Sequence, residues 1–114
     1  MRYMLLIGSD KSAPPAPAAE MAGLVDGHRR FSEELARAGK MVVGERLRPD
    51  AEASRVRLKA GQRQVIDGPF AETKELMVGF YLIEAASAQE ALDWARKIPL
   101  TEAGFVEVRP VWHM

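Results

Sequence analysis

The sequence contains no cysteine and only two histidines, His28 and His113, in 114 residues. The absence of cysteine excludes disulfides, thiolate metal sites and cysteine nucleophiles. The two histidines lie too far apart along the chain to form a metal-binding motif, and no glycine-rich phosphate-binding loop is present. We therefore expect neither a bound metal nor a cofactor.

An excess of charge of one sign is also missing. Sixteen basic and sixteen acidic side chains cancel, whereas nucleic-acid-binding proteins usually carry a basic excess or stripe. Long hydrophobic runs are missing too, and the apolar N-terminal segment is too short for a signal-peptide core or a membrane span. The sequence therefore predicts one cytoplasmic domain over residues 1–114 that contacts neither nucleic acid nor membrane.

Hydrophobic periodicity predicts the order strand, helix, strand, hairpin, strand, helix, strand. A helix is predicted from about Ala18 to Gly39, and a second follows the capping box of Ser87 and Glu90 and ends at Pro99. Strands are predicted over 2–8, 40–47, 76–85 and 105–112, and a hairpin over 55–67. This order fits a ferredoxin-like α+β fold, βαβ(ββ)βαβ, with an antiparallel sheet of about five strands and two helices on one face.

The predicted strand 76–85 is apolar on both faces. Leu76, Val78, Phe80 and Leu82 alternate with Met77, Tyr81 and Ile83. Two helices cover only one face of a sheet, which leaves roughly 500 Å² of the other uncovered. Burying that area contributes roughly 12 kcal/mol before the cost of association. We therefore expect a homodimer packed sheet to sheet; the alternative is a monomer with a ligand on this face.

His28 is the first candidate for chemistry. It lies in helical register with Leu24, Phe31 and Leu35, so it occupies the buried face of the first helix. A histidine there is either a core residue with one satisfied nitrogen or a functional group. The functional role requires a carboxylate or carbonyl to fix the tautomer and a cavity in front of the other nitrogen. His113 is next to the last residue, and we expect it to be frayed.

The segment "VIDGPFAETKE", residues 65–75, is long and charged for a hairpin connection. One interpretation is a solvated turn, in which Asp67 accepts backbone amides just downstream. The other is a pocket wall beside His28, because a proline followed by Phe70 is typical of a loop anchored to the body. This second interpretation predicts that Phe70 is largely buried and that Glu72 and Lys74 present charge to a ligand.

The last predicted strand contains Arg109 within "VEVRPVW". A strand arginine beside apolar neighbours is usually at an edge or paired. If it points into a pocket, its planar fork suits a carboxylate ligand.

Three stretches, "DGPFAETKE", "LMVGFYLIEAASAQEALDWARKIP" and "VEVRPVW", resemble the YCII-related domain and, more narrowly, its DGPF branch. The resemblance covers nearly the whole chain. It implies a ferredoxin-like domain that pairs its sheets into a dimeric α+β barrel. It also implies a relation to alternative sigma factors that are encoded beside such proteins.

The resemblance also implies a catalytic site that contains a histidine and an aspartate. In better-understood relatives a histidine of the first helix and an aspartate of an Asp-Pro step form a catalytic pair. His28 matches that histidine, but here Ile98 precedes Pro99, so the carboxylate is absent. Asp67 is the candidate replacement.

Two functions follow from these residues. The first is an acid–base enzyme, lyase-like or isomerase-like, in which Asp67 orients His28 and Lys74 or Arg109 stabilises a developing anion. The alternative is a metabolite-binding or regulatory module without catalysis. The enzyme requires that His28 line a cavity and have a carboxylate within hydrogen-bond reach, whereas a regulator does not.

Overall fold

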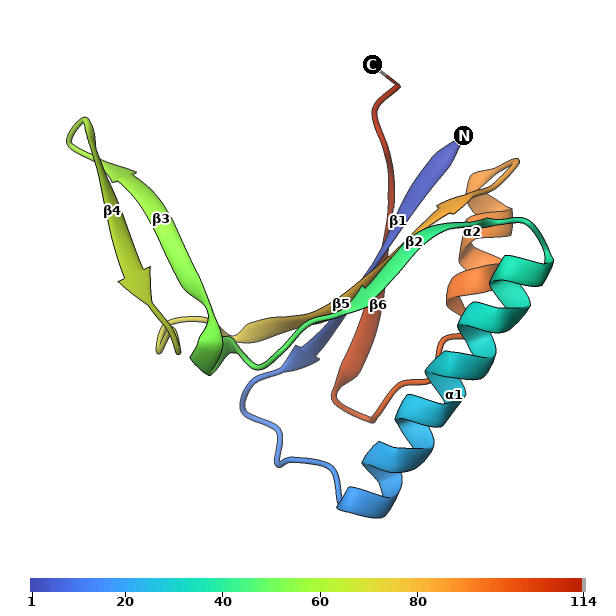
Figure 1. The fold of residues 1–114 in the computed structure, drawn as a ribbon, viewed down its shortest axis with the longest axis horizontal. Helices are drawn as coiled ribbons and strands as arrows, with labels where there is room; N and C mark the ends of the chain where they lie inside the picture. The colour runs from blue at the N-terminus through green and yellow to red at the C-terminus, as the bar shows by residue number, and fades with distance from the viewer. Residues whose placement is uncertain (114) are drawn as a thin grey trace.

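The computed structural model describes residues 1–113 as a four-stranded antiparallel sheet with two helices on one face, and a separate two-stranded hairpin (Figure 1). The sheet has the strand order β2-β5-β1-β6. Its strands are β1 (Arg2–Asp10), β2 (Met41–Arg46), β5 (Glu75–Glu84) and β6 (Gly104–Pro110), and its helices are α1 (Ala18–Arg37) and α2 (Ala88–Ala95). The predicted α+β fold with both helices on one face is confirmed.

Local signals predict the start of α2 and the end of α1, whereas α2 ends at Ala95, before the predicted stop at Pro99. The Ser87 hydroxyl accepts the Glu90 backbone N–H at 3.1 Å and caps the start of α2. Gly39 follows α1 with a φ of 72°, a left-handed conformation that glycine adopts without strain. No helix within residues 1–113 is both long and apolar enough to span a membrane.

The core lies between the sheet and the two helices. The sheet contributes alternate residues of its central strands, and α1 contributes Phe31 and Leu35. The register aligns Leu5 of β1 with Tyr81 of β5, so these side chains share the helix-facing side. The buried cluster comprises Tyr3, Leu5, Ile7, Phe31, Leu35, Tyr81, Ile83, Ala85, Ala91, Ala95 and Ile98.

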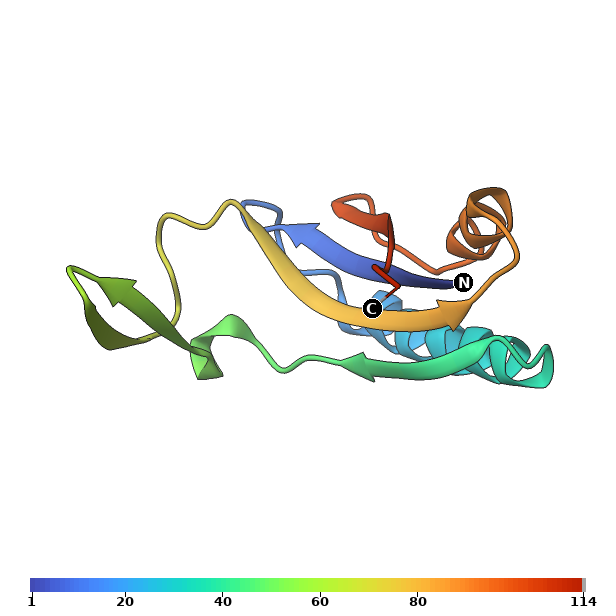
Figure 2. The same cartoon turned by 90° about the horizontal axis from the view of Figure 1, so that it is seen from above.

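The other face of the sheet is not covered by either helix (Figures 1 and 2). The register places Leu6 beside Phe80 and Met4 beside Leu82 on this face, and all four are only partly buried. Val43 pairs with Leu82 at the β2 edge and is 40% exposed. We call this surface the open face. It matches the second apolar face predicted for strand 76–85.

The hairpin differs from the prediction, since it does not join the main sheet. Strands β3 (Ser54–Lys59) and β4 (Gln62–Asp67) pair only with each other. They form an arm, residues 54–67, that extends beyond the sheet and bends away from the helices (Figure 1). The main sheet therefore has four strands and not about five. A short 3-10 helix, η1 (Asp50–Glu52), precedes the arm.

The arm exposes apolar side chains. Val56 lies opposite Val65, and Leu58 follows on the same face by strand alternation. Their exposed fractions are 64% for Val56, 70% for Val65 and 64% for Leu58. An isolated two-stranded hairpin is marginally stable in water, so the arm requires an anchor at its base.

Candidate functional site

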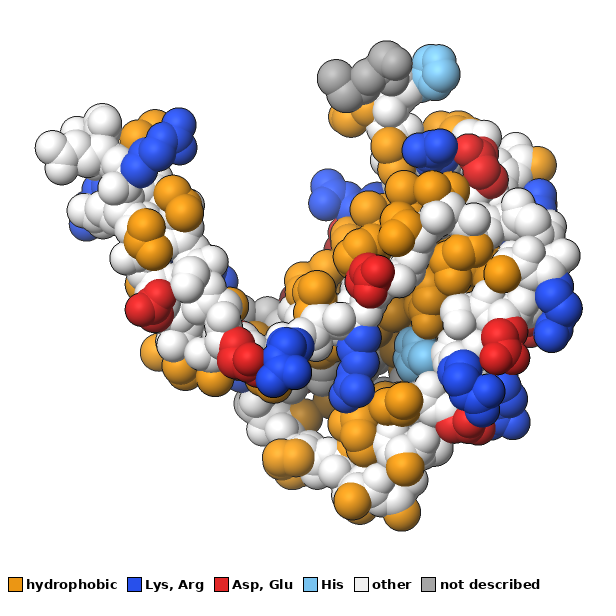
Figure 3. Space-filling view, viewed as in Figure 1, with side chains coloured by type: hydrophobic (Ala, Val, Ile, Leu, Met, Phe, Trp, Pro, Cys, Tyr) orange, Lys and Arg blue, Asp and Glu red, His pale blue; other side chains and the backbone are white. Residues whose placement is uncertain are grey.

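A cavity of about 770 Å³ lies between α1 and the helix-facing side of the sheet. Its volume is within the usual range of small-molecule sites, roughly 300–1,000 Å³. Apolar and basic side chains meet around the hollow in Figure 3. Its lining includes apolar side chains of α1, β1, β2 and β5 together with His28 and Tyr81. The required cavity beside His28 is therefore present.

Both ring nitrogens of His28 have partners. Nδ1 lies 2.9 Å from the Tyr81 hydroxyl oxygen, and Nε2 lies 2.9 Å from the carbonyl oxygen of Pro99. A carbonyl oxygen only accepts, so Nε2 must carry the proton. In the neutral ring Nδ1 is then an acceptor, and the Tyr81 hydroxyl donates to it. The result is a directed hydrogen-bond chain from Tyr81 through His28 to Pro99.

Packing holds each member of this chain in place. A Cβ on Gly44 would lie 2.5 Å from a Tyr81 ring carbon, so the glycine gives the ring its room. Phe31 contacts the Tyr81 ring edge-on, with centroids 5.1 Å apart. Buried Ile98 fixes the chain just before the Pro99 carbonyl. A site built on packed elements keeps the donor and acceptor geometry that proton transfer requires.

Burial lowers the pKa of His28 below its usual value of 6.5, and the positive charge of Arg46 lowers it further, against an opposing effect of the Pro99 carbonyl. The unfolded histidine therefore binds a proton at a higher pH than the folded one does. We expect the protein to lose stability as pH falls from about 6.5 towards the folded pKa, and to be insensitive to this group above that range. NMR titration of the His28 ring, beside urea unfolding at several pH values, measures both effects.

The matched control for this titration is Asp67→Asn. The Asp67 carboxylate accepts from the Ser54 hydroxyl at 2.9 Å, on the exposed surface of the arm. We expect the substitution to leave the depressed pKa of His28 unchanged. A His28 pKa above 6.5 that falls in Asp67→Asn would contradict the geometry described here.

The structure does not bring Asp67 to His28. The two ring nitrogens contact Tyr81 and Pro99, and residues 67–75 are absent from the cavity lining within the described chain. The expected His28–Asp67 pair and the expected pocket wall are therefore not formed within one chain. Asp67 also has the Ser54 hydroxyl as its partner, where backbone amides just downstream were expected.

The DGPF segment instead anchors the arm. Phe70 is only 7% exposed, which confirms the predicted burial. The Arg55 guanidinium of β3 lies 3.8 Å from the Phe70 ring centroid and also donates to the Thr73 hydroxyl at 3.0 Å. Lys11, at the end of β1, donates to the Phe70 carbonyl. These contacts join the base of the arm to the body and explain why the connection is long and charged.

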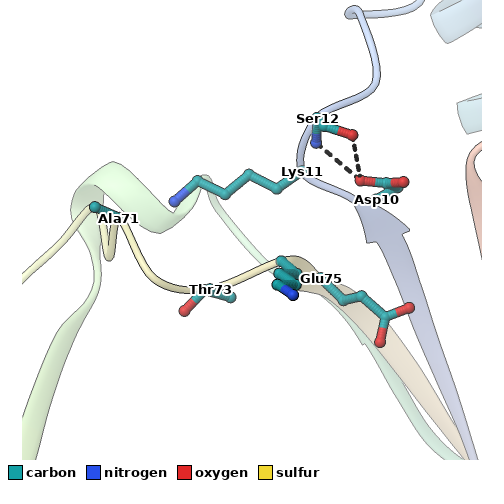
Figure 4. A pocket seen from close by; sticks show the side chains of 7 residues that line it. Asp10, Lys11, Ser12, Ala71, Thr73 and Glu75 are labelled. Atoms are coloured by element: carbon teal, nitrogen blue, oxygen red, sulfur yellow. Dashed lines mark hydrogen bonds between the residues drawn. The ribbon is translucent and has the colours of Figure 1, made fainter.

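Glu72 and Lys74 lie at this anchor and not in the His28 cavity. Glu72 pairs with Arg55, with 3.6 Å between nitrogen and oxygen. Lys74 lines a second hollow of about 610 Å³ between the end of β1 and the start of β5 (Figure 4). There Asp10 accepts from the backbone and hydroxyl of Ser12, and these bonds lower its pKa.

Arg109 lies on the open face. It aligns with Met4 and pairs with Glu107, with 3.4 Å between nitrogen and oxygen. It therefore cannot stabilise an anion in the His28 cavity of its own chain. Sequence reasoning missed Tyr81 as the partner of His28, although the alternation in strand 76–85 already placed Tyr81 and Ile83 on one face.

Comparison with known proteins identifies the family of this chain. The family model for the YCII-related domain matches residues 1–114. The chain belongs to the YCII-related domain family. An uncharacterized protein, R00369, of Rhizobium meliloti (strain 1021) is 42% identical over 118 residues, which span 97% of this chain and 92% of that protein. The narrower DGPF branch stays a prediction based on residues 67–70.

In this YCII-related protein a backbone carbonyl contacts His28, whereas the family resemblance implies the carboxylate of an aspartate as its partner. Ile98 replaces the aspartate implied by the resemblance, and its side chain is buried in the core. The next residue, Pro99, supplies its carbonyl oxygen to Nε2 of His28. The orienting acceptor is therefore neutral, so it stabilises the imidazolium less than a carboxylate does.

Proposed function

We propose that this YCII-related protein binds a small organic molecule in the His28 cavity and exchanges a proton with it through Tyr81 and His28. The observation that carries the proposal is the directed chain from the Pro99 carbonyl through His28 to a hydroxyl in the cavity wall. The chemical class is a lyase-like or isomerase-like reaction, in which a proton leaves one atom of the substrate.

The proton transfer balances without a further reactant. A substrate proton passes to the Tyr81 oxygen as the Tyr81 hydroxyl proton passes to Nδ1 of His28. The imidazolium then donates from both nitrogens, and reversal returns a proton to the substrate. Burial raises the pKa of Tyr81 and lowers that of His28, so both groups are neutral before the reaction at neutral pH. His28 is the final proton acceptor, and no tyrosinate is required.

The test is a screen of small carbonyl, lactone and halogenated ring compounds. With a substrate in hand, Tyr81→Phe and His28→Gln should each lower turnover by about 10²–10⁴-fold, the usual contribution of a positioned acid or base. Tyr81→Phe keeps the ring that packs on Phe31, so binding should persist. Asp67→Asn is the control and should retain full turnover. Undiminished turnover in Tyr81→Phe would rule out the relay.

One observation favours a second function, a metabolite-binding or regulatory module. Among residues 1–113 no carboxylate contacts His28, although the enzyme was expected to require one. This alternative includes the relation to an alternative sigma factor that the resemblance implies. If this alternative is correct, a compound should bind in the cavity and remain chemically unchanged on long incubation. Its binding should also change the affinity of this protein for a protein partner.

We also propose that two copies associate through the open face. Partly exposed Met4, Leu6, Phe80 and Leu82 form a continuous apolar surface in the middle of the sheet. The arm bends away from the helices, so it borders the same side of the molecule (Figures 1 and 3). A second copy on this surface would cover the open face and give the exposed apolar side chains of the arm a partner.

A further inference from the structure

We infer that the ligand of the His28 cavity is a small organic anion whose carboxylate binds Arg46. This inference rests on the proposed function, because it concerns the same cavity, and it names the chemical class of the ligand. Arg46 is the last residue of β2 and lines the cavity.

The strand register determines the direction of the Arg46 side chain. Arg46 aligns with Gly79 of β5, which aligns with Ile7 of β1. Buried Ile7 belongs to the core cluster, so this row is on the helix-facing side. Two residues along β2, Gly44 aligns with Tyr81, and this row lies on the same side. Arg46 and the Tyr81 hydroxyl therefore belong to one wall of the cavity. A Cβ on Gly79 would lie 2.9 Å from the Glu45 carbonyl oxygen, so the glycine allows the close approach of β2 and β5 beside Arg46.

Arg46 is distinguished from the other basic residues of the cavity by its lack of a partner. Arg29 pairs with Asp26 and Glu33, and Arg48 pairs with Glu52. Arg46 is an exposed residue, and within residues 1–113 its side chain forms no ion pair and no hydrogen bond.

The acidic side chains nearby are not placed to neutralise Arg46. Glu45 aligns with Phe80 and points to the open face. Asp50 lies 3.8 Å from the Lys11 amino group. A guanidinium without a protein partner, on the wall of a cavity, suits a carboxylate because its planar fork donates two parallel hydrogen bonds.

The rest of the lining fits an organic body. Apolar side chains of α1 and the sheet cover the cavity between Arg46 and α1; they include Met21, Leu24, Val25, Met41 and Met77. Flexible methionines adapt to ligands of irregular shape. An apolar skeleton with a carboxylate at one end therefore matches both parts of the site, with Tyr81 positioned to contact a polar atom of that skeleton.

The experiment compares two probes of nearly equal shape, phenylacetate and phenylacetamide, which differ in charge at neutral pH. NMR titration of the His28 and Tyr81 ring signals gives each dissociation constant. The wild type should bind phenylacetate about tenfold more tightly, as expected for one charge-assisted contact. Arg46→Gln should reduce this ratio to about one, and Arg46→Lys should keep part of it. Arg109→Gln, on the open face, is the matched control and should keep the full ratio.

Three outcomes would overturn the inference: equal affinity for both probes in the wild type, an unchanged ratio in Arg46→Gln, or no binding of either probe at millimolar concentration. The test is separate from that of the proton relay. Tyr81→Phe should retain the preference for phenylacetate even if no compound is turned over, so the relay can fail alone. The anion site can also fail alone. If the protein turns over a neutral substrate but binds phenylacetate and phenylacetamide equally tightly, the relay stands and only the anion site is rejected.

Discussion

We expect that replacing Phe80 with aspartate converts the proposed dimer into a monomer. Phe80 lies in the centre of the open face, where Leu6 and Glu45 flank it in the strand register. Glu107 completes the row on β6. A carboxylate at this position would be buried against the partner without a counter-charge, which costs several kcal/mol. It would also lie directly beside Glu45 on the neighbouring strand.

Sedimentation equilibrium at micromolar concentrations measures this change. Leu92→Asp is the matched control, because Leu92 is 41% exposed on α2, on the other side of the molecule. We expect Leu92→Asp to remain dimeric and both variants to keep the far-ultraviolet circular dichroism of the wild type. A wild type with a monomer mass at every concentration would reject the dimer outright.

Phe70→Ala should release the arm from the body. The Phe70 ring is buried and lies under the Arg55 guanidinium, so its removal leaves a cavity and abolishes the contact between the guanidinium and the ring. Removing a buried phenylalanine side chain costs about 3–5 kcal/mol. Here we expect the lost free energy to make local opening of residues 54–75 easier, without unfolding the main sheet. Hydrogen exchange should show faster exchange of the arm amides, with β1 and β5 still protected.

Val65→Ala is the matched control for the arm. Val65 is 70% exposed, so truncation removes little packing and should change stability within about 0.5 kcal/mol. Equal exchange rates in Phe70→Ala and the wild type would show that the arm is held by other contacts. Rapid exchange of residues 68–75 in the wild type itself would mean that the segment is a loose loop.

Local patterns in the sequence predict the elements of this fold well. The alternation of strand 76–85 separates Tyr81 and Ile83 from Phe80 and Leu82, and β5 places these pairs on opposite faces. Serine and glutamate of the capping box start α2 as expected. Such patterns succeed because side-chain direction repeats with the period of the backbone, whatever the neighbouring elements are.

Local patterns did not predict that the hairpin stays separate from the main sheet. Its strands have the same alternation as those of the main sheet, yet they pair only with each other. Joining the sheet requires a free edge and a connection of suitable geometry, and neither is encoded within six residues of strand. The charged DGPF segment suggested a pocket wall, but charge alone does not distinguish a ligand site from an anchor for Arg55 and Lys11.

By itself the sequence determined the α+β class, the helices, the apolar second face and the candidacy of His28, because each depends on periodicity or composition close along the chain. Only the tertiary structure decided what His28 contacts. Tyr81 is 53 residues away and Pro99 is 71 residues away, and Arg46 reaches the same cavity from the edge strand. Such partners depend on the register between strands and the packing of α1 on the sheet, which are set by the whole core rather than by any local stretch.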